Sequence, residues 1–307
     1  MEATSRPASS LREPVMTDVL STVQWSFVRS YRALSYAFSV RTNVPRAGFL
    51  LDRLLTPFRA ADSNGAPTYS LVQTANEPRR FSLYVGDARL QEAESASSML
   101  DLVLAHVTVQ AVEQLDDHVA VHAAAASWEG RGIILPGEPD AGKTTLVAGL
   151  TQAGMAYLSD EAALIDPGTG LLHPYPRALA MDAQSVDAIP GLRSKLPLDH
   201  EQFMRYRFHV APDDLRSGAV GGPCRVRYVI APKYEAGTET ALQPMSRAEA
   251  LMMLAKNSFN FPRFGALALD SLHGVLDGVN CYHLRVGSLE DAIQKVLAVV
   301  EGDPNRL

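Results

Sequence analysis

The chain has 307 residues, of which 47% are hydrophobic and 20% charged, and its formal net charge is -6. This length accommodates one large domain or two smaller ones. The acidic charge, with no lysine or arginine run, argues against a nucleic-acid partner. The lack of an apolar run of about 18 residues argues against a membrane span. The two cysteines, Cys224 and Cys281, lack metal-ligand or redox spacing, which predicts a soluble protein of the reducing cytoplasm.

The first 94 residues divide into a tail and a small domain. Residues 1–14 are rich in serine, proline and arginine and offer little to bury, so we expect a disordered tail. Alternating apolar segments within residues 15–94 predict strands at 36–40, 69–73 and 81–85 and a short helix at 49–58. These elements indicate a small α+β domain, to which no chemical motif can be assigned.

Residues 95–307 are expected to form a second domain, of the α/β class. Apolar residues at helical spacing predict a helix at 95–115, and we expect it to buttress the sheet of this domain. Strands at 119–123 and 132–135 follow, joined by a turn at Glu129-Gly130.

The most informative motif follows the second of these strands. It is a Gly-x4-Gly-Lys-Thr sequence leading into a predicted helix at 144–153, which is the context of a phosphate-binding loop. Glycines let backbone N–H groups curl around a phosphate, the helix N-terminus adds a positive dipole end, and Lys143 adds a full charge. The predicted ligand is a nucleoside triphosphate, taken as ATP, with Mg2+ on the Thr144 hydroxyl. The predicted phosphate-binding residues are Gly137, Asp140, Ala141, Gly142, Lys143, Thr144 and Thr145.

Two acids follow at the end of the next predicted strand, 155–161. In a parallel βαβ unit the carboxyl end of that strand opens onto the same crevice as the loop, so Asp160 and Glu161 are candidates for holding Mg2+ or for taking a proton from a hydroxyl. The alternative is a solvated turn. His122, on the strand that precedes the loop strand, is a third candidate, against the alternative of an ordinary core histidine.

The rest of the chain supplies further elements and weaker candidates. We expect a hairpin at 163–174, a loop-rich stretch at 175–222 of the kind that forms active-site lids, a strand at 226–231, and helices at 246–259 and 289–300. Candidates to clamp a phosphate bidentately, if they are not ordinary surface residues, are Arg177, Arg205 and Arg207. Candidates to reach the site from the C-terminal region are Lys233, Asn257 and Asn260, the last also explicable as a helix C-cap.

Taken together, these residues resemble a known family. His122, then the Gly137 to Thr145 segment, then Leu158-Ser159-Asp160-Glu161 resemble the order and spacing found in HPr kinase and its relatives. The resemblance is strongest over residues 118–182. It continues more weakly through 231–234 and 256–260, where it is similar to the HPr-kinase-related kinases encoded beside small-peptide modification systems.

The resemblance implies a fold and a set of roles. The fold would be an α/β, HPr-kinase C-terminal-like nucleotide-binding domain with a smaller N-terminal α+β domain, assembling into a homo-oligomer. Asp160 would be the base that accepts the proton of a serine hydroxyl, Glu161 would assist with metal, and His122 would position the phosphates. Glu161 and Thr144 stand where the bifunctional enzyme has aspartate and serine, and the glycine-rich segment linked to dephosphorylation is missing, so phosphorylase activity is not expected.

The sequence is therefore compatible with three functions. The favoured one is transfer of the γ-phosphate of ATP to a serine hydroxyl of a peptide or small protein. A small-molecule kinase on the same scaffold is the second, because fold and nucleotide site do not determine the acceptor. The third is a nucleotide-dependent regulatory NTPase or switch, which the short interval between Lys143 and Asp160 disfavours.

Overall fold

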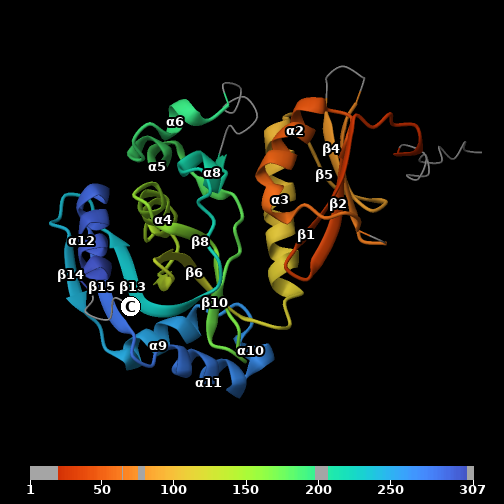
Figure 1. The fold of residues 1–307 in the computed structure, drawn as a ribbon. Coiled ribbons are helices and arrows are strands. Elements are labelled where there is room, and N and C mark those ends of the chain that lie inside the picture. Colours follow the sequence, from red (N-terminus) through yellow and green to blue (C-terminus); the bar gives the residue numbers. More distant parts are fainter. Residues whose placement is uncertain (1–19, 64, 75–79, 198–206, 303–307) are drawn as a thin grey trace, which may run out of the picture.

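The computed structural model describes residues 20–63, 65–74, 80–197 and 207–302. The predicted tail at 1–14 and the candidate Arg205 lie outside these ranges. The described chain is a mixed α/β structure with one sheet near each end of the molecule and helices α2 and α3 between them (Figure 1). No helix in the described ranges has the length and apolar character needed to cross a bilayer.

The N-terminal sheet contains the three predicted strands and two that were not predicted. Its order is β1-β2-β3-β4-β5, and all neighbours are antiparallel except β2 and β3. A parallel pair needs a crossover, which the helix α2 and the short 3-10 turn η1 supply. Proline in the first turn starts α2 four residues before the predicted helix. The bounds are β1 Phe27–Ala33, β2 Tyr36–Thr42, α2 Pro45–Leu54, η1 Thr56–Phe58, β3 Thr68–Gln73, β4 Phe81–Val85 and β5 Ala88–Ala93.

Helix α3 (Ala96–Glu113) begins where it was predicted and packs between the two sheets. The Ser95 side chain caps it by accepting from the Ser98 N–H. Its buried residues join the core of the N-terminal sheet, and His106 Nδ1 lies 2.7 Å from the Tyr69 hydroxyl of β3. The expectation that this helix buttresses the second sheet covers only part of its packing: its buried residues share one core with the first sheet, with Ala120, Ala162 and Leu164 of the second sheet, and with Tyr175.

The second sheet holds the predicted site. Its order is β10-β9-β6-β7-β13-β15-β14, and β8 also pairs with β6. β7, β13 and β15 are parallel to one another. β7 and β8 both run antiparallel to β6, which lies between them. β7 and β8 are therefore parallel to each other, and with α4 they form the expected crossover unit. The bounds are β6 Val119–Trp128, β7 Arg131–Pro136, β8 Ala156–Ser159, β9 Ala162–Ile165, β10 Leu171–His173, β13 Cys224–Tyr234, β14 Ala241–Pro244 and β15 Asn280–Val286.

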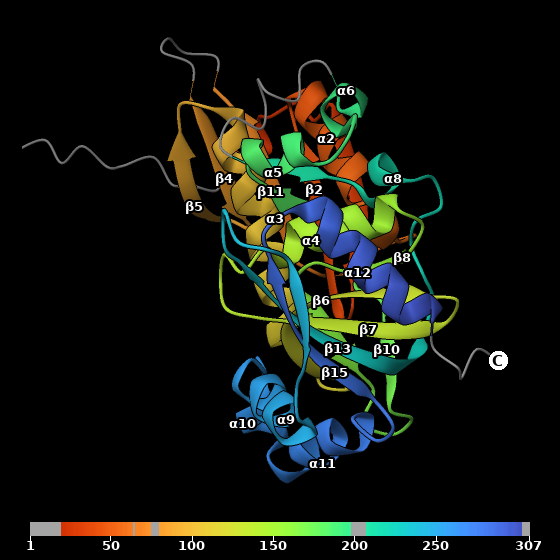
Figure 2. The ribbon, with the colours of Figure 1, turned by 90° about the vertical axis from the view of Figure 1, so that its left-hand side faces the viewer.

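Helices cover both faces of this sheet because its strands are apolar on both faces. On β7, Ile133 and Leu135 face α4 and α12, whereas Ile134 between them faces α9 and α11 (Figure 2). The predicted helix 246–259 ends early: α9 stops at Lys256, and a second short helix begins at Phe261. The bounds are α4 Lys143–Gln152, α9 Arg247–Lys256, α10 Phe261–Phe264, α11 Ala266–Val275 and α12 Leu289–Glu301.

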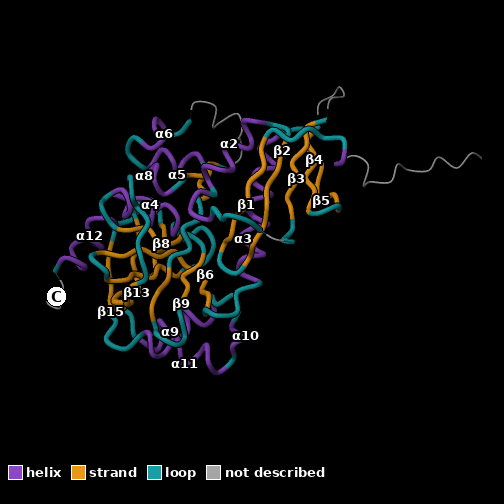
Figure 3. Tube along the Cα trace, turned by 45° about the vertical axis from the view of Figure 1, so that its right-hand side comes forward, coloured by secondary structure: helices purple, strands orange, loops and turns teal. Residues whose placement is uncertain are grey.

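The stretch predicted to be loop-rich, 175–222, contains short elements. A two-stranded sheet of β11 (Leu179–Met181) and β12 (Phe208–Val210) lies with helices α5, α6 and α8 beside α4 (Figure 3). An ion pair and a hydrogen bond join this stretch to the N-terminal helices: Arg53 of α2 pairs with Asp214, and His209 Nε2 lies 2.7 Å from Asp101 Oδ1 of α3. The helix bounds are α5 Ala183–Ala188, α6 Leu192–Lys195 and α8 Pro212–Leu215.

Candidate functional site

The loop that joins β7 to α4, residues 137–142, is called the glycine loop below. Asp140 and Gly142 adopt left-handed backbone conformations, with φ of 61° and 88°. A Cβ at Gly137 would lie 3.1 Å from the Cβ of Ala141, so the loop closes tightly on itself. Gly142 occupies the N-cap of α4 and supplies no side-chain cap, which leaves the first N–H groups of the helix available to an anion.

Lys143 is held inside this loop. Its Nζ donates to the carbonyl oxygens of Gly137 at 2.7 Å and Glu138 at 2.9 Å. Burial lowers the pKa of Lys143, and the nearby carboxylates, Glu161 foremost, act against that effect. A buried ammonium group at a helix N-terminus is electrostatically costly unless anions approach it, and these carboxylates supply part of that charge.

The two predicted acids differ sharply in exposure. Asp160 is only 3% exposed, whereas the side chain of Glu161 is 30% exposed. Asp160 accepts hydrogen bonds from the Tyr157 hydroxyl at 3.2 Å and the Ala180 N–H at 3.4 Å, and Arg177 Nε lies 3.5 Å away. Burial raises the pKa of Asp160, although the Arg177 charge opposes it. Asp160 is thus a buried acid whose oxygens already have partners.

Glu161 faces outward between two basic groups. Its Oε2 accepts from Arg177 Nη1 at 3.1 Å, and its Oε1 lies 3.3 Å from His122 Nδ1. Burial acts to raise the pKa of Glu161, but His122, Arg177 and Lys143 outweigh it and hold that pKa below its ordinary range. The structure therefore brings Glu161 together with His122, Arg177 and Lys143, and Glu161 is the more exposed of the two adjacent acids.

His122 is fixed by its neighbours on β6 and after α9. Its backbone N–H donates to Asn257 O at 2.7 Å, and its ring meets the Phe259 ring edge-on with centroids 5.3 Å apart. The side chain is 27% exposed, so it is not the fully enclosed core histidine that was weighed as its alternative.

Several other candidate residues are not part of the group formed by Lys143, Glu161, His122 and Arg177. Thr145 donates to Ser185 Oγ at 3.0 Å, and Lys233 is exposed and paired with Glu235. Arg207 is exposed, and no hydrogen bond or ion pair in the described ranges joins it to the other candidates. The interpretation of Asn260 as a helix C-cap is wrong, because it precedes α10 and its amide joins two backbone groups of the β6 segment.

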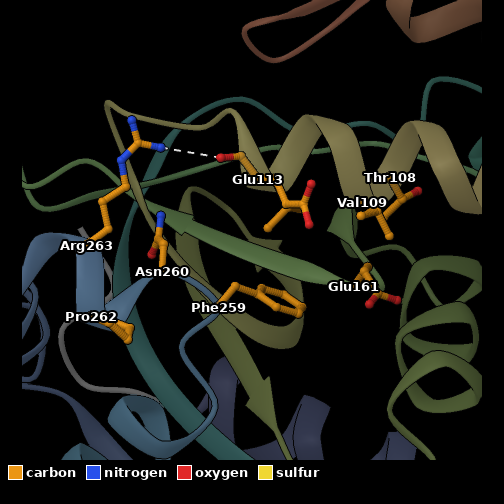
Figure 4. A pocket seen from close by; sticks show the side chains of 9 residues that line it. Thr108, Val109, Glu113, Glu161, Phe259, Asn260, Pro262 and Arg263 are labelled. Atoms are coloured by element: carbon orange, nitrogen blue, oxygen red, sulfur yellow. Dashed lines mark hydrogen bonds between the residues drawn. The ribbon is translucent and has the colours of Figure 1, made fainter.

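Sequence reasoning missed a pocket that opens beside Glu161. Its volume is about 460 Å³, and it lies between α3 and the α9–α10 connection, with Glu161 on one side and Arg263 and Asn260 on the other (Figure 4). Two of its apolar residues, Val109 and Phe259, are half-exposed in the structure. The sequence does not show that exposure, and single exposed apolar residues are too common to indicate a site. The lining residues are Thr108, Val109, Val112, Glu113, Glu161, Phe259, Asn260, Pro262 and Arg263.

The donor set near the glycine loop suits a hard cation that is bound together with phosphate. Among the described residues, no cluster of three or more His, Cys, Asp or Glu side chains is arranged to hold a metal ion. Mg2+ commonly uses one or two protein oxygens, with phosphates and waters completing its shell. The Thr144 hydroxyl, which has no hydrogen-bond partner among the described residues, and the Glu161 carboxylate are oxygen donors of this kind.

Comparisons with known proteins give little beyond the geometry. No family model matches the chain, and no curated protein matches it. One solved structure that matches is the HPr(Ser) kinase/phosphatase from Coxiella burnetii, with 12% sequence identity, over 60% of this chain and 94% of that one, at a TM-score of 0.29. A likeness this weak carries no argument about the reaction.

Proposed function

We propose that this protein is an ATP-dependent kinase that transfers the γ-phosphoryl group to a hydroxyl, with a serine of a peptide or small protein as acceptor. One observation carries the proposal: a buried lysine in a glycine-rich strand–helix turn lies in the electrostatic field of an accessible carboxylate, Glu161, which Arg177 and His122 hold in place. Phosphoryl transfer relies mainly on positioning and charge stabilisation, and these groups provide both.

In the proposed complex the glycine loop and Lys143 bind the β- and γ-phosphates. The loop N–H groups and the first turn of α4 would donate to phosphate oxygens, and Lys143 would exchange its loop carbonyls for them. Thr144 and Glu161 would hold Mg2+ with the triphosphate, where the cation neutralises negative charge that develops during transfer.

The reaction exchanges one bond at phosphorus and moves one proton. The acceptor oxygen bonds to the γ-phosphorus, the bond from that phosphorus to the β–γ bridging oxygen breaks, ADP leaves, and the acceptor proton passes to a carboxylate. Exposure favours Glu161 for this last role in addition to its contact with Mg2+, with Asp160 acting through Arg177 as a positioning residue, whereas the resemblance implied that Asp160 is the base. A carboxylate of low pKa suffices because the transition state is loose and demands little base strength.

The proposal is tested by intact-mass spectrometry of the peptides and small proteins encoded beside this gene, incubated with the purified protein and Mg-ATP. We expect a gain of one phosphate on a serine with the wild-type protein. Lys143→Ala should reduce turnover on the order of a hundredfold or more, because it removes the positive charge that would bind the transferring phosphoryl group. Unchanged turnover in Lys143→Ala would refute the assignment of the loop. ATP hydrolysis without any phosphorylated product would instead favour a nucleotide-dependent switch.

A further inference from the structure

The pocket beside Glu161 has a distinctive chemical character. From α3 it receives Val109, 50% exposed, and the buried Val112; Phe259, 44% exposed, comes from the α9–α10 connection, and Pro262 comes from α10. The side chain of Phe259 lies across from α3 in Figure 4, with Glu161 next to it. An exposed aromatic ring and an exposed valine that line one hollow form an apolar surface that a ligand can cover.

Most polar groups in the lining are already engaged. Asn260 Oδ1 accepts from Ala120 N–H at 3.0 Å, and its Nδ2 donates to His118 O at 2.9 Å. Arg263 Nη1 donates to the carbonyl oxygens of Glu113 and Leu115 at the end of α3. A polyol or another hydrogen-bonding small molecule needs several precisely directed polar partners, and the Asn260 amide and the Nη1 group of Arg263 are already bound to the backbone.

Glu161 connects this pocket to the proposed phosphate site. Its carboxylate lines the pocket, while its two oxygens face Arg177 and His122 and its charge acts on Lys143. His122 in turn contacts Phe259 of the pocket. A group bound in the pocket therefore lies beside the residues that would carry out the transfer.

We infer that this pocket binds the phosphoryl acceptor, and that the acceptor is a peptide segment carrying an apolar side chain next to the reacting serine. The inference rests on the proposed function and specifies its substrate. The serine hydroxyl would approach Glu161, and the neighbouring apolar side chain would cover Val109 and Phe259. Apolar contact with Val109 and Phe259 would then select the residue beside the serine.

The test measures transfer to short serine peptides with one variable neighbour. Peptides of the form acetyl-Ala-Ala-X-Ser-Y-Ala-Ala-amide, with leucine, lysine or aspartate at X or Y, are incubated with the full-length protein, Mg2+ and ATP labelled at the γ-phosphate. The readout is the ratio of kcat/KM values among peptides for each protein, which does not depend on the fraction of active enzyme. The variants are Val109→Asp and Val109→Lys, and the matched control is Ala105→Asp, exposed one turn earlier on α3 and absent from the pocket lining.

The wild-type protein is expected to prefer leucine over aspartate and lysine by about tenfold or more, the discrimination typical of a hydrophobic pocket. Val109→Asp should shift the preference towards lysine, Val109→Lys towards aspartate, and Ala105→Asp should keep the wild-type order. Equal use of the three peptides by the wild type, or an unchanged order in both Val109 variants, would overturn the inference. If ATP is consumed in a way that requires Lys143 but no peptide is labelled, the inference about the acceptor is overturned and the proposed function is not. If Lys143→Ala consumes ATP as fast as the wild type, the proposed function is overturned as well.

Discussion

At the scale of single residues, burial separates two adjacent acids that the sequence presents as equivalent. Asp160 is enclosed by Tyr157, Ala180 and Arg177, whereas Glu161 reaches the pocket. Their pKa values shift in opposite directions, because burial dominates for Asp160 and the neighbouring cations dominate for Glu161. Asp160 is therefore suited to holding Arg177 in place, and Glu161 to contacting a bound substrate.

The two acids should therefore respond differently to neutralisation. Asp160→Asn should lower the free energy of unfolding on the order of 1–3 kcal/mol, because it weakens the pairing of the buried Arg177. Glu161→Gln should have a smaller effect on unfolding and should reduce transfer on the order of a hundredfold. Urea unfolding and single-turnover kinetics on both variants measure this. An Asp160→Asn protein of native stability that has lost transfer would return the base role to Asp160.

The lowered pKa of Glu161 also predicts a dependence of stability on pH. A carboxylate whose folded-state pKa lies below its ordinary value of 4.5 adds stability that is complete above that value and is lost as the pH falls through the lowered pKa. The wild type should thus lose its stability advantage over Glu161→Gln as the pH falls from about 6 to about 3. Unfolding measured across this range checks the sign; an advantage that grows on acidification would contradict it.

At the scale of elements, α4 is positioned by its contact with α12. Gly149 lies on the face of α4 that meets this helix, and a Cβ built there would approach Ile293 Cδ1 to 2.6 Å. Glycine in a helix interior costs about 1 kcal/mol relative to alanine, and here it permits close packing of the helix that begins at Lys143. The orientation of the glycine loop therefore depends on a contact made at the far end of α4.

A double-mutant cycle measures this contact. Gly149→Ala should destabilise the protein by about 1 kcal/mol, since the clash with Ile293 exceeds the gain in helix propensity. Ile293→Val removes the clashing Cδ1, so Gly149→Ala should be neutral or stabilising in that background. The four free energies of unfolding give the coupling. An effect of Gly149→Ala that is equal in both backgrounds would show that the contact does not limit packing.

At the scale of the whole molecule, the N-terminal unit is part of the site's construction. Helix α3 packs against the first sheet and also forms one side of the pocket beside Glu161. Arg53 and Asp214 tie α2 to the 175–222 stretch, and Asp101 and His209 tie α3 to the same stretch. The two units therefore position the pocket between them, and a change in their docking changes the proposed acceptor site.

The Arg53–Asp214 pair offers a test of this docking. Burial raises the pKa of Asp214, while Arg53 opposes the rise. Arg53→Ala should destabilise the protein by roughly 3 kcal/mol, because it leaves a mostly buried carboxylate without its cation. The double variant Arg53→Met with Asp214→Leu should recover much of that loss, as urea unfolding would show. A single variant as stable as the wild type would mean that the pair does not hold the units together.

Local patterns predicted many elements correctly, since neighbouring residues determine them. The helix predicted at 289–300, the strand before the glycine loop and the helix after it lie close to their predicted ranges, because periodicity and end signals act within a few residues. The strands β1 and β5 were missed because exposed and charged positions interrupt their apolar alternation. The packing of α3 against the first sheet was not predicted, because an apolar helix face does not indicate which surfaces it will meet.

The candidate site, like the fold, was predictable from the sequence only in part. The sequence by itself determined the glycine loop with Lys143 at the start of a helix, since that arrangement needs only adjacent residues with suitable backbone freedom. Only the tertiary structure decided that Asp160 is buried, that Glu161 meets His122 and Arg177, and that α3 and Phe259 enclose a pocket beside them. The physical reason is that burial and ion pairing depend on segments distant in the sequence, whose packing no local pattern specifies.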